Sequence, residues 1–161
     1  MTKPAERFYR SHRKDSKEGY YSHAMIYSPQ VLFIRDDEGE WQPPIEVDVV
    51  TSAAVNAGVV RRYLRERKSE DESEIYVAMK ERMARILFLF ERYGVRNVIL
   101  GSFGTGVFRN SVELVAEIWG ELLMADDARF KNSFDHVVFA ILGFSTFNTF
   151  EKTLAKALVT A

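Results

Sequence analysis

The stretch VILGSFGTGVFRNSVELVAEIW, residues 98–119, joins an apolar run to a helical pattern through a segment with three glycines. The apolar run 98–100 predicts a strand, and the spacing of the apolar residues after position 111 predicts a helix. Backbone amides point outward in many strand-to-helix connections, and the helix dipole adds partial positive charge, so such a connection can hold an anion. The pattern Gly101-x-x-Gly104-x-Gly106 matches neither the Rossmann fingerprint nor the Walker A loop. The spacing alone therefore leaves two interpretations open: a phosphate-binding loop, or a tight turn that needs glycine for its backbone angles.

Three further strands are predicted around this stretch, over residues 31–34, 47–51 and 136–142. A turn at 36–39 follows the first strand, and Pro43 and Pro44 are expected to interrupt any strand that continues beyond it. The last strand, HVVFAIL, is apolar throughout, which is typical of a strand covered on both faces. Small residues end the second strand, so a ligand or another backbone can come close at residues 51–53.

Helices are predicted on the remaining periodic segments. Residues 61–67 indicate a charged helix, and an apolar stripe at helical spacing predicts a longer helix that Gly94 ends. The members of that stripe are Ile75, Met79, Met83, Ile86, Leu87, Phe90 and Tyr93. Asn110 and Glu113 are placed like a cap pair for the helix that follows the glycine segment.

Strands and helices alternate along the chain, which predicts an α/β fold with a mostly parallel sheet and flanking helices. No internal repeat, low-complexity tract or linker interrupts the sequence, so we expect one domain over residues 1–161. Ligands of such sheets bind beyond the carboxyl ends of the strands. If strand 47–51 is parallel to strand 98–100, its small residues lie beside the glycine segment, and the two segments form a groove for an extended ligand.

The composition excludes several classes of function. The chain has 161 residues, of which 47% are hydrophobic, and a formal net charge of −1, which indicates a folded soluble domain and disfavours nucleic acid as a partner. It has no cysteine, and its histidines, His12, His23 and His136, lack metal-ligand spacing, so we expect no metal and no cofactor. No apolar run has the length of a membrane helix, and the first residues lack the apolar core of a secretory signal. We therefore expect no membrane partner and a location in the cytoplasm or the nucleus.

Several motifs, in order along the chain, resemble the microbial-type poly(ADP-ribose) glycohydrolase family, a branch of the macrodomain fold. They are MIYSPQVLFIRDDEGEW, VDVVTSAAVNAG, RILFLFERYGVRNVILGSFGTGVFRNSVELVAEIW and FDHVVFAIL. The most specific is LGSFGTGVFRN, which is similar to L-G-A-W-G-C-G-V-F-x-N in the family.

The resemblance implies a binding site for ADP-ribose. Residues 102–108 correspond to the loop around the diphosphate, Phe108 lies beside the distal ribose, and residues 51–53 flank the same cleft. We expect the amides around Thr105 and Val107 to converge on a concavity that fits a pyrophosphate. The ligand-binding residues implied are Thr51, Ser52, Ala53, Ser102, Phe103, Gly104, Thr105, Gly106, Val107 and Phe108.

The sequence departs from the family in one respect. In the family, a triple-glycine loop, followed six residues later by Gln-Glu-Glu, precedes these motifs and carries the catalytic glutamate; this sequence contains neither segment. We therefore expect a truncated macrodomain-like domain that lacks N-terminal strands and binds ADP-ribose, or ADP-ribosylated protein, without cleaving it.

Two alternatives remain open. The first is an ADP-ribosyl or poly(ADP-ribose) glycohydrolase whose catalytic carboxylate is substituted or supplied by a partner. The second is a non-enzymatic scaffold that forms homo-oligomers through an uncovered sheet edge, because an open edge can pair with another chain.

Overall fold

The computed structural model of the chain describes residues 3–14 and 17–159, and its contacts divide the chain into two compact units. The first unit consists of residues 1–15 and 22–53, and the second of residues 16–21 and 54–161. The single domain predicted over residues 1–161 stays a prediction.

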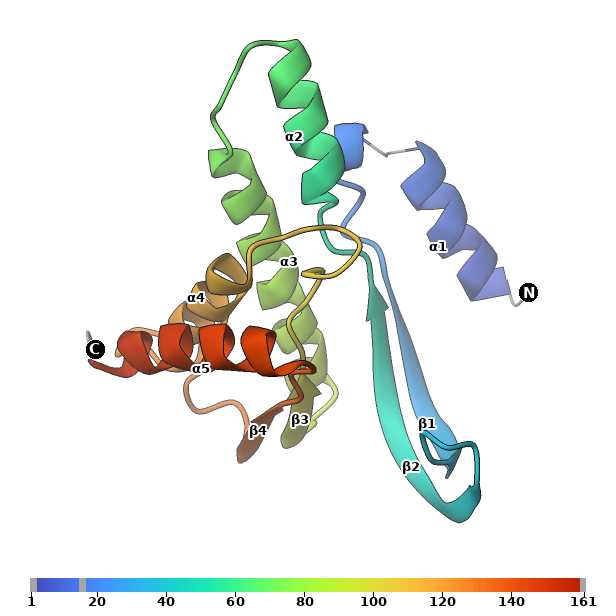
Figure 1. The fold of residues 1–161 in the computed structure, drawn as a ribbon. Coiled ribbons are helices and arrows are strands. Elements are labelled where there is room, and N and C mark those ends of the chain that lie inside the picture. Colours follow the sequence, from blue (N-terminus) through green and yellow to red (C-terminus); the bar gives the residue numbers. More distant parts are fainter. Residues whose placement is uncertain (1–2, 15–16, 160–161) are drawn as a thin grey trace. The chain divides into compact units, whose positions relative to one another are not determined.

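The first unit consists of helix α1, Lys3–Lys14, and a hairpin of two long strands, β1, Met25–Arg35, and β2, Trp41–Ser52 (Figure 1). The strands are antiparallel, with Met25 opposite Ser52 and Phe33 opposite Ile45. The predicted turn at 36–39 is confirmed: the amide of Gly39 donates to the carbonyl of Asp36, and Oδ1 of Asp36 accepts the amide of Glu40 at 2.8 Å. A short run of conventional turn residues was therefore enough to locate the hairpin.

Pro43 and Pro44 do not interrupt the strand, contrary to the sequence-based expectation, and β2 runs through both. They lie at an irregular step of the ladder, where Phe33 pairs with Ile45 and Arg35 pairs with Trp41, so residues 42–44 have no regular partner. Proline is tolerated at such a bulge because no regular ladder hydrogen bond is broken.

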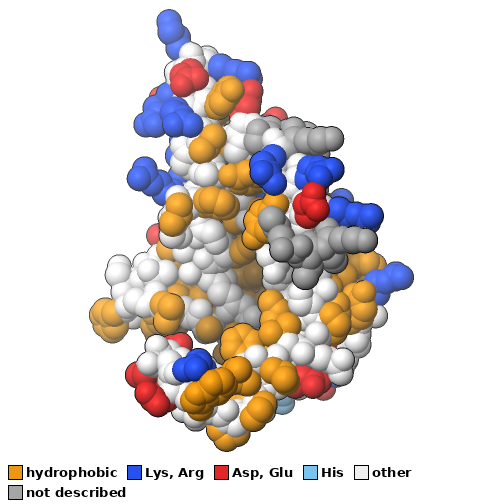
Figure 2. Space-filling view, turned by 90° about the vertical axis from the view of Figure 1, so that its right-hand side faces the viewer, with side chains coloured by type: hydrophobic (Ala, Val, Ile, Leu, Met, Phe, Trp, Pro, Cys, Tyr) orange, Lys and Arg blue, Asp and Glu red, His pale blue; other side chains and the backbone are white. Residues whose placement is uncertain are grey.

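The hairpin exposes large apolar side chains. Leu32, Phe33, Trp41 and Ile45 are each more than half exposed, and apolar side chains gather at the surface around the lower end of the view in Figure 2. Arg35 covers part of Trp41, with its guanidinium carbon 4.0 Å from the ring centroid. A two-stranded hairpin is only marginally stable in water by itself. The exposed apolar side chains do not contribute to its stability through burial within the hairpin.

The second unit contains the short 3₁₀ turn η1, Lys17–Gly19, four helices and two strands. These are α2, Ala57–Glu66; α3, Ser73–Arg92; β3, Asn97–Leu100; α4, Val112–Leu123; β4, His136–Phe139; and α5, Phe144–Val159. Helix α4 packs against both α3 and α5 (Figure 1). The predicted stripe of α3 is buried except for Tyr93, and Gly94 ends the helix with a φ angle of 70°.

Strands β3 and β4 form a parallel pair in register, from Asn97 opposite His136 to Leu100 opposite Phe139. Val98 and Leu100 are buried, whereas Ile99 is 74% exposed and Val138 is 54% exposed. The expectation that strand 136–142 is covered on both faces is therefore wrong, and the strand ends at Phe139. The α/β class is confirmed, with one parallel and one antiparallel pair among the described residues. Strand 47–51 belongs to the antiparallel pair, so the condition set for the predicted groove is not met.

Candidate functional site

The glycine segment forms the connection between β3 and α4, residues 101–111. Its start is fixed by Trp119 of α4, whose Nε1 donates to the carbonyl of Gly101 at 3.2 Å. Its end is the cap of α4: the side chain of Ser111 accepts the amide of Leu114 at 3.2 Å. Ser111 is therefore the cap residue in place of the predicted Asn110, because Asn110 is buried in the loop.

Gly104 is a glycine that the fold itself requires. Its φ angle is 75°, in the left-handed region that favours glycine. A Cβ atom at this position would lie 2.4 Å from Cβ of Ala54 and 2.7 Å from Nδ2 of Asn110. The loop thus passes against the chain at Ala54 too closely for any side chain.

Asn110 ties the loop to the interior. Its Nδ2 donates to the carbonyl of Val55 at 2.8 Å and to the carbonyl of Gly104 at 3.0 Å, and its amide also donates to Gly104 at 3.2 Å. The side chain is 4% exposed. Its Oδ1 is buried and accepts no hydrogen bond from the described part of the chain. These bonds fix both ends of the turn between Gly104 and Asn110.

The tip of the loop offers backbone donors. Gly106 is exposed, Val107 is 91% exposed, and a Cβ atom on Gly106 would meet nothing within 4 Å. Within residues 3–14 and 17–159, no acceptor is found for the amides of four residues: Gly104, Gly106, Val107 and Phe108. Successive unpaired amides in a loop are usual components of an anion site.

Thr105 differs from these four residues. Its amide donates to the carbonyl of Ser102 at 3.2 Å, and its Oγ1 donates to the same carbonyl at 2.9 Å. The amide of Thr105 is therefore used inside the loop, and the role of Thr105 at a ligand stays a prediction. A threonine three residues after a serine favours this local turn.

Helix α2 holds the far side of the loop. The amide of Gly58, in its first turn, donates to the carbonyl of Phe108 at 3.1 Å. Arg61 donates to the carbonyl of Arg109 at 2.7 Å, and Nε of Arg61 also lies 2.8 Å from a carboxylate oxygen of Glu72. Hydrogen bonding to Glu72 raises the pKa of Arg61. Arg61 therefore links the loop to the start of α3 by charge-assisted bonds.

The side chain of Phe108 packs on an aromatic neighbour. Its ring is stacked on that of Tyr21, with 5.8 Å between centroids and 25° between the ring planes. Arg82 of α3 anchors the backbone of Tyr20 and Tyr21. Its Nη2 donates to the carbonyl of Tyr20 at 2.8 Å and to the carbonyl of Tyr21 at 3.3 Å. The loop and this segment belong to the same unit.

The second predicted segment lies in the other unit. Thr51 and Ser52 end β2, opposite Ile26 and Met25, and Ala53 follows them. Thr51 is exposed, and the Oγ of Ser52 is buried without a hydrogen-bond partner among the described residues. The role of residues 51–53 at the ligand stays a prediction.

The titration of the acidic groups bears on catalysis. A carboxyl group that acts as a general acid near neutral pH needs a raised pKa. Among the described residues, every carboxyl group with a resolved shift has a lowered pKa: Asp36, Asp48, Asp71, Glu91, Glu113, Glu121 and Asp135. For Glu113, next to the loop, the cause is the hydrogen bond from Ser111.

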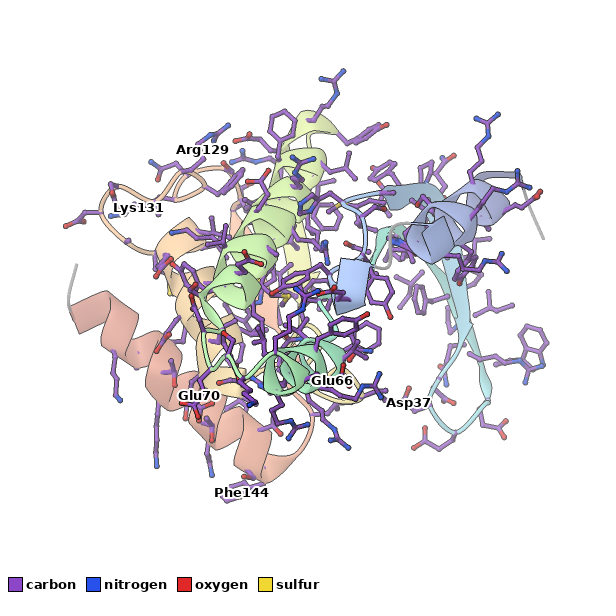
Figure 3. All side chains as sticks on the ribbon, turned by 90° about the horizontal axis from the view of Figure 1, so that it is seen from above. Asp37, Glu66, Glu70, Arg129, Lys131 and Phe144 are labelled. Carbon is purple, nitrogen blue, oxygen red and sulfur yellow. The ribbon has the colours of Figure 1, made fainter. Side chains whose placement is uncertain are left out.

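The described ranges contain neither a metal-binding cluster nor a membrane-spanning helix. No group of three or more His, Asp or Glu side chains is placed to hold a metal ion. No helix there combines the length and apolar character that a membrane span requires. The charged side chains Arg129 and Lys131, on the connection from α4 to β4 (Figure 3), are paired with Glu91 and Asp126.

The sequence alone did not indicate Tyr21, Arg61, Arg82 or Asn110 as parts of the loop's surroundings. Asn110 was visible as the last residue of a glycine-rich motif, but its position suggested a helix cap. Tyr21 and Arg82 are far from the loop along the chain and follow no local pattern. Their contribution depends on tertiary contacts that periodicity does not encode.

Comparison with known proteins gives a consistent result. A family model described as "Microbial-type PARG, catalytic domain" matches residues 1–36. The poly(ADP-ribose) glycohydrolase (PARG) from Deinococcus radiodurans in complex with ADP-ribose is 32% identical, with a TM-score of 0.83 over 99% of this chain and 62% of that chain. Its apo form is 33% identical, with a TM-score of 0.82 over 96% of this chain and 62% of that chain.

A second organism gives the same picture. The poly(ADP-ribose) glycohydrolase from Thermomonospora curvata is 32% identical, with a TM-score of 0.80 over 95% of this chain and 53% of that chain. The chain therefore spans less than two thirds of the length of these solved structures. No curated protein matches it. The similarity to these structures confirms the macrodomain-like α/β fold inferred from the motifs.

Proposed function

Because the chain is related to the microbial-type poly(ADP-ribose) glycohydrolases, we propose that it binds ADP-ribose, free or attached to a protein, through the loop between β3 and α4. The observation that carries the proposal is the loop tip, where the amides of Gly104, Gly106, Val107 and Phe108 have no acceptor in the described chain. One of the matched structures is a complex with ADP-ribose.

The chemistry of the loop fits a diphosphate. Unpaired amides give short, directed hydrogen bonds to phosphate oxygens, and several of them in one loop can surround an anion. Gly106 leaves open space where a side chain would stand, so that a phosphate can approach the backbone. In this proposal residues 102–107 surround the diphosphate, and the ring of Phe108 lies beside the distal ribose.

Calorimetry with ADP-ribose tests the proposal, with two variants of the same loop. Gly106→Val fills the open side of the loop without a clash in the protein, so it should abolish the heat of binding while leaving the unfolding temperature unchanged. Gly101→Ala adds a methyl group at the start of the loop, 3.7 Å from the carbonyl oxygen of Ala140, and should bind like the wild type. No heat from the wild type at millimolar ligand, or equal affinity in the Gly106→Val variant, would count against the proposal.

A glycohydrolase is the second candidate function, because the matched proteins carry that name. The seven carboxyl groups with a resolved shift all have a lowered pKa, so none of these seven is suited to be the substituted general acid. Turnover of ADP-ribosylated protein by the purified chain alone would support substitution. Turnover that requires an added polypeptide carrying a Gln-Glu-Glu segment would support complementation, and no turnover in either case would leave binding as the function.

A further inference from the structure

We infer that Tyr21 is a positioning residue, which fixes the ring of Phe108 and thereby lets the loop distinguish ADP-ribose from ADP. The inference rests on the proposed function and deepens it. It assigns a specificity role to a residue outside the glycine motif, on a segment 87 positions earlier in the chain than Phe108.

The contact between the two rings has the geometry of a stable aromatic pair. The centroids lie 5.8 Å apart and the planes are 25° from parallel, which is the range of offset-stacked pairs. The rings are too close together for a base or another flat group to enter between them, so the pair works as one unit. Phe108 is only half-buried, so its other surroundings restrict it less than a core position would.

The backbone under Tyr21 is fixed by a buried arginine. Arg82 is 1% exposed, and it donates to the carbonyls of both Tyr20 and Tyr21. Burial, with a smaller contribution from the charge of Arg85, lowers the pKa of Arg82 to about 10. A second anchor lies two residues before Tyr21, where the carbonyl of Gly19 accepts the amide of Asn56 at 2.8 Å.

The backbone beside Phe108 is fixed as well. Gly58 binds its carbonyl, and Arg61 binds the carbonyl of Arg109. Both Tyr21, with a φ angle of 56°, and Arg109, with 57°, adopt the left-handed conformation although neither is glycine. Such conformations persist only where the surroundings impose them, and they concentrate at functional sites. The backbone is therefore fixed on both sides of the ring pair, at Tyr21 and beside Phe108.

A fixed ring of Phe108 should strengthen contact with the distal ribose of the ligand and not with its adenosine or diphosphate. A ring already held beside the distal ribose loses little motional freedom on contact, so it adds to affinity where a free ring would not. ADP contains the same diphosphate and adenosine but no distal ribose. Loss of the Tyr21 ring should therefore weaken ADP-ribose and spare ADP, whereas a general loosening of the loop should weaken both.

Calorimetry of both nucleotides with three variants tests the inference. Tyr21→Ala should weaken ADP-ribose binding about three- to tenfold and change ADP binding by less than about twofold, the range expected for one aromatic pair. Tyr21→Phe keeps the stack, so the ratio of its affinities for the two ligands should stay that of the wild type. Tyr93→Ala removes an exposed tyrosine of the same unit and serves as the control. An equal loss for both nucleotides, or no loss for either, overturns the inference.

A measurement without ligand separates this inference from the proposed function. Fluorine NMR of the chain with 4-fluorophenylalanine placed only at position 108 should give one resonance that shifts or broadens in Tyr21→Ala and not in Tyr93→Ala. An unchanged resonance overturns the positioning role even if ADP-ribose binds. A wild type that binds neither nucleotide overturns the proposed function and the selectivity with it, and the fluorine spectrum then decides the packing role alone.

Discussion

Gly104 and Gly106, two residues apart in one loop, should respond to the same substitution in opposite ways. A methyl group on Gly104 would lie 2.4 Å from Cβ of Ala54 and 2.7 Å from Nδ2 of Asn110, on a backbone with a φ angle of 75°. A methyl group on Gly106 would meet nothing within 4 Å, and its backbone is not left-handed. Gly104→Ala should therefore destabilise the fold, and Gly106→Ala should not.

The magnitude follows from two contributions. An alanine forced into the left-handed region costs about 1–2 kcal/mol. Displacing the Asn110 amide from the carbonyls of Val55 and Gly104 leaves buried polar groups unsatisfied, which costs about 1–3 kcal/mol. We expect a loss of about 3 kcal/mol in the free energy of unfolding, or about 6–12 °C in the melting temperature of a domain of this size. Gly106→Ala should remain within about 0.5 kcal/mol of the wild type.

Urea unfolding followed by circular dichroism, with thermal scans of the same three proteins, measures these differences. A smaller urea midpoint for Gly104→Ala at an unchanged slope would show that stability, and not the unfolded state, has changed. Equal midpoints for Gly104→Ala and the wild type would refute the close approach at Ala54. A large loss in Gly106→Ala would refute the open loop tip.

Three further results are expected. Arg61→Ala should lower stability by about 1–2 kcal/mol because it removes bonds to Arg109 and Glu72, and Arg61→Lys should not restore it, since lysine lacks the guanidinium fork; full recovery in the lysine variant, measured by urea unfolding, would contradict this. The hydrogen bond from Arg129 lowers the pKa of Glu91, so the ionised carboxylate stabilises the fold above the unfolded-state pKa of 4.5, and this stabilisation is lost as the pH falls through the lower folded-state pKa. The urea midpoint should therefore fall less steeply with decreasing pH in Glu91→Gln than in the wild type. Equal pH dependence in the two proteins would contradict this coupling. Ile99→Lys and Val138→Lys should reduce self-association in light scattering, because they charge the exposed face of the β3–β4 pair; a strictly monomeric wild type would rule out the homo-oligomer predicted from the sequence.

The sequence predicted the elements whose signal is local. The turn at 36–39, the stripe of α3 and the strand that leads into the glycine segment were all placed within a few residues. The motif LGSFGTGVFRN also indicated the relationship to the glycohydrolases, because most of its residues match the motif of that family at the same spacing. Local chemistry and a distinctive motif were sufficient for these features.

Pairing between distant segments could not be predicted in the same way. Strand 47–51 reads equally well as parallel or antiparallel, and only its ladder with β1 decides the matter. The cap of α4 was misplaced by one residue because Asn110 and Ser111 are both good cap residues, and burial of Asn110 by Val55 selects Ser111. The contact of Tyr21 with Phe108 likewise depends on the anchoring of two separate segments.

The two adjacent prolines of β2 have a consequence for how this hairpin meets other polypeptides. Neither Pro43 nor Pro44 carries an amide hydrogen, so the hairpin presents an interrupted row of donors near its tip. An extended peptide that pairs with this edge would leave some of its carbonyl groups without a hydrogen-bond donor. Exposed strand edges with apolar side chains tend to pair with one another and aggregate. The two prolines oppose such edge-to-edge pairing near the tip of the hairpin.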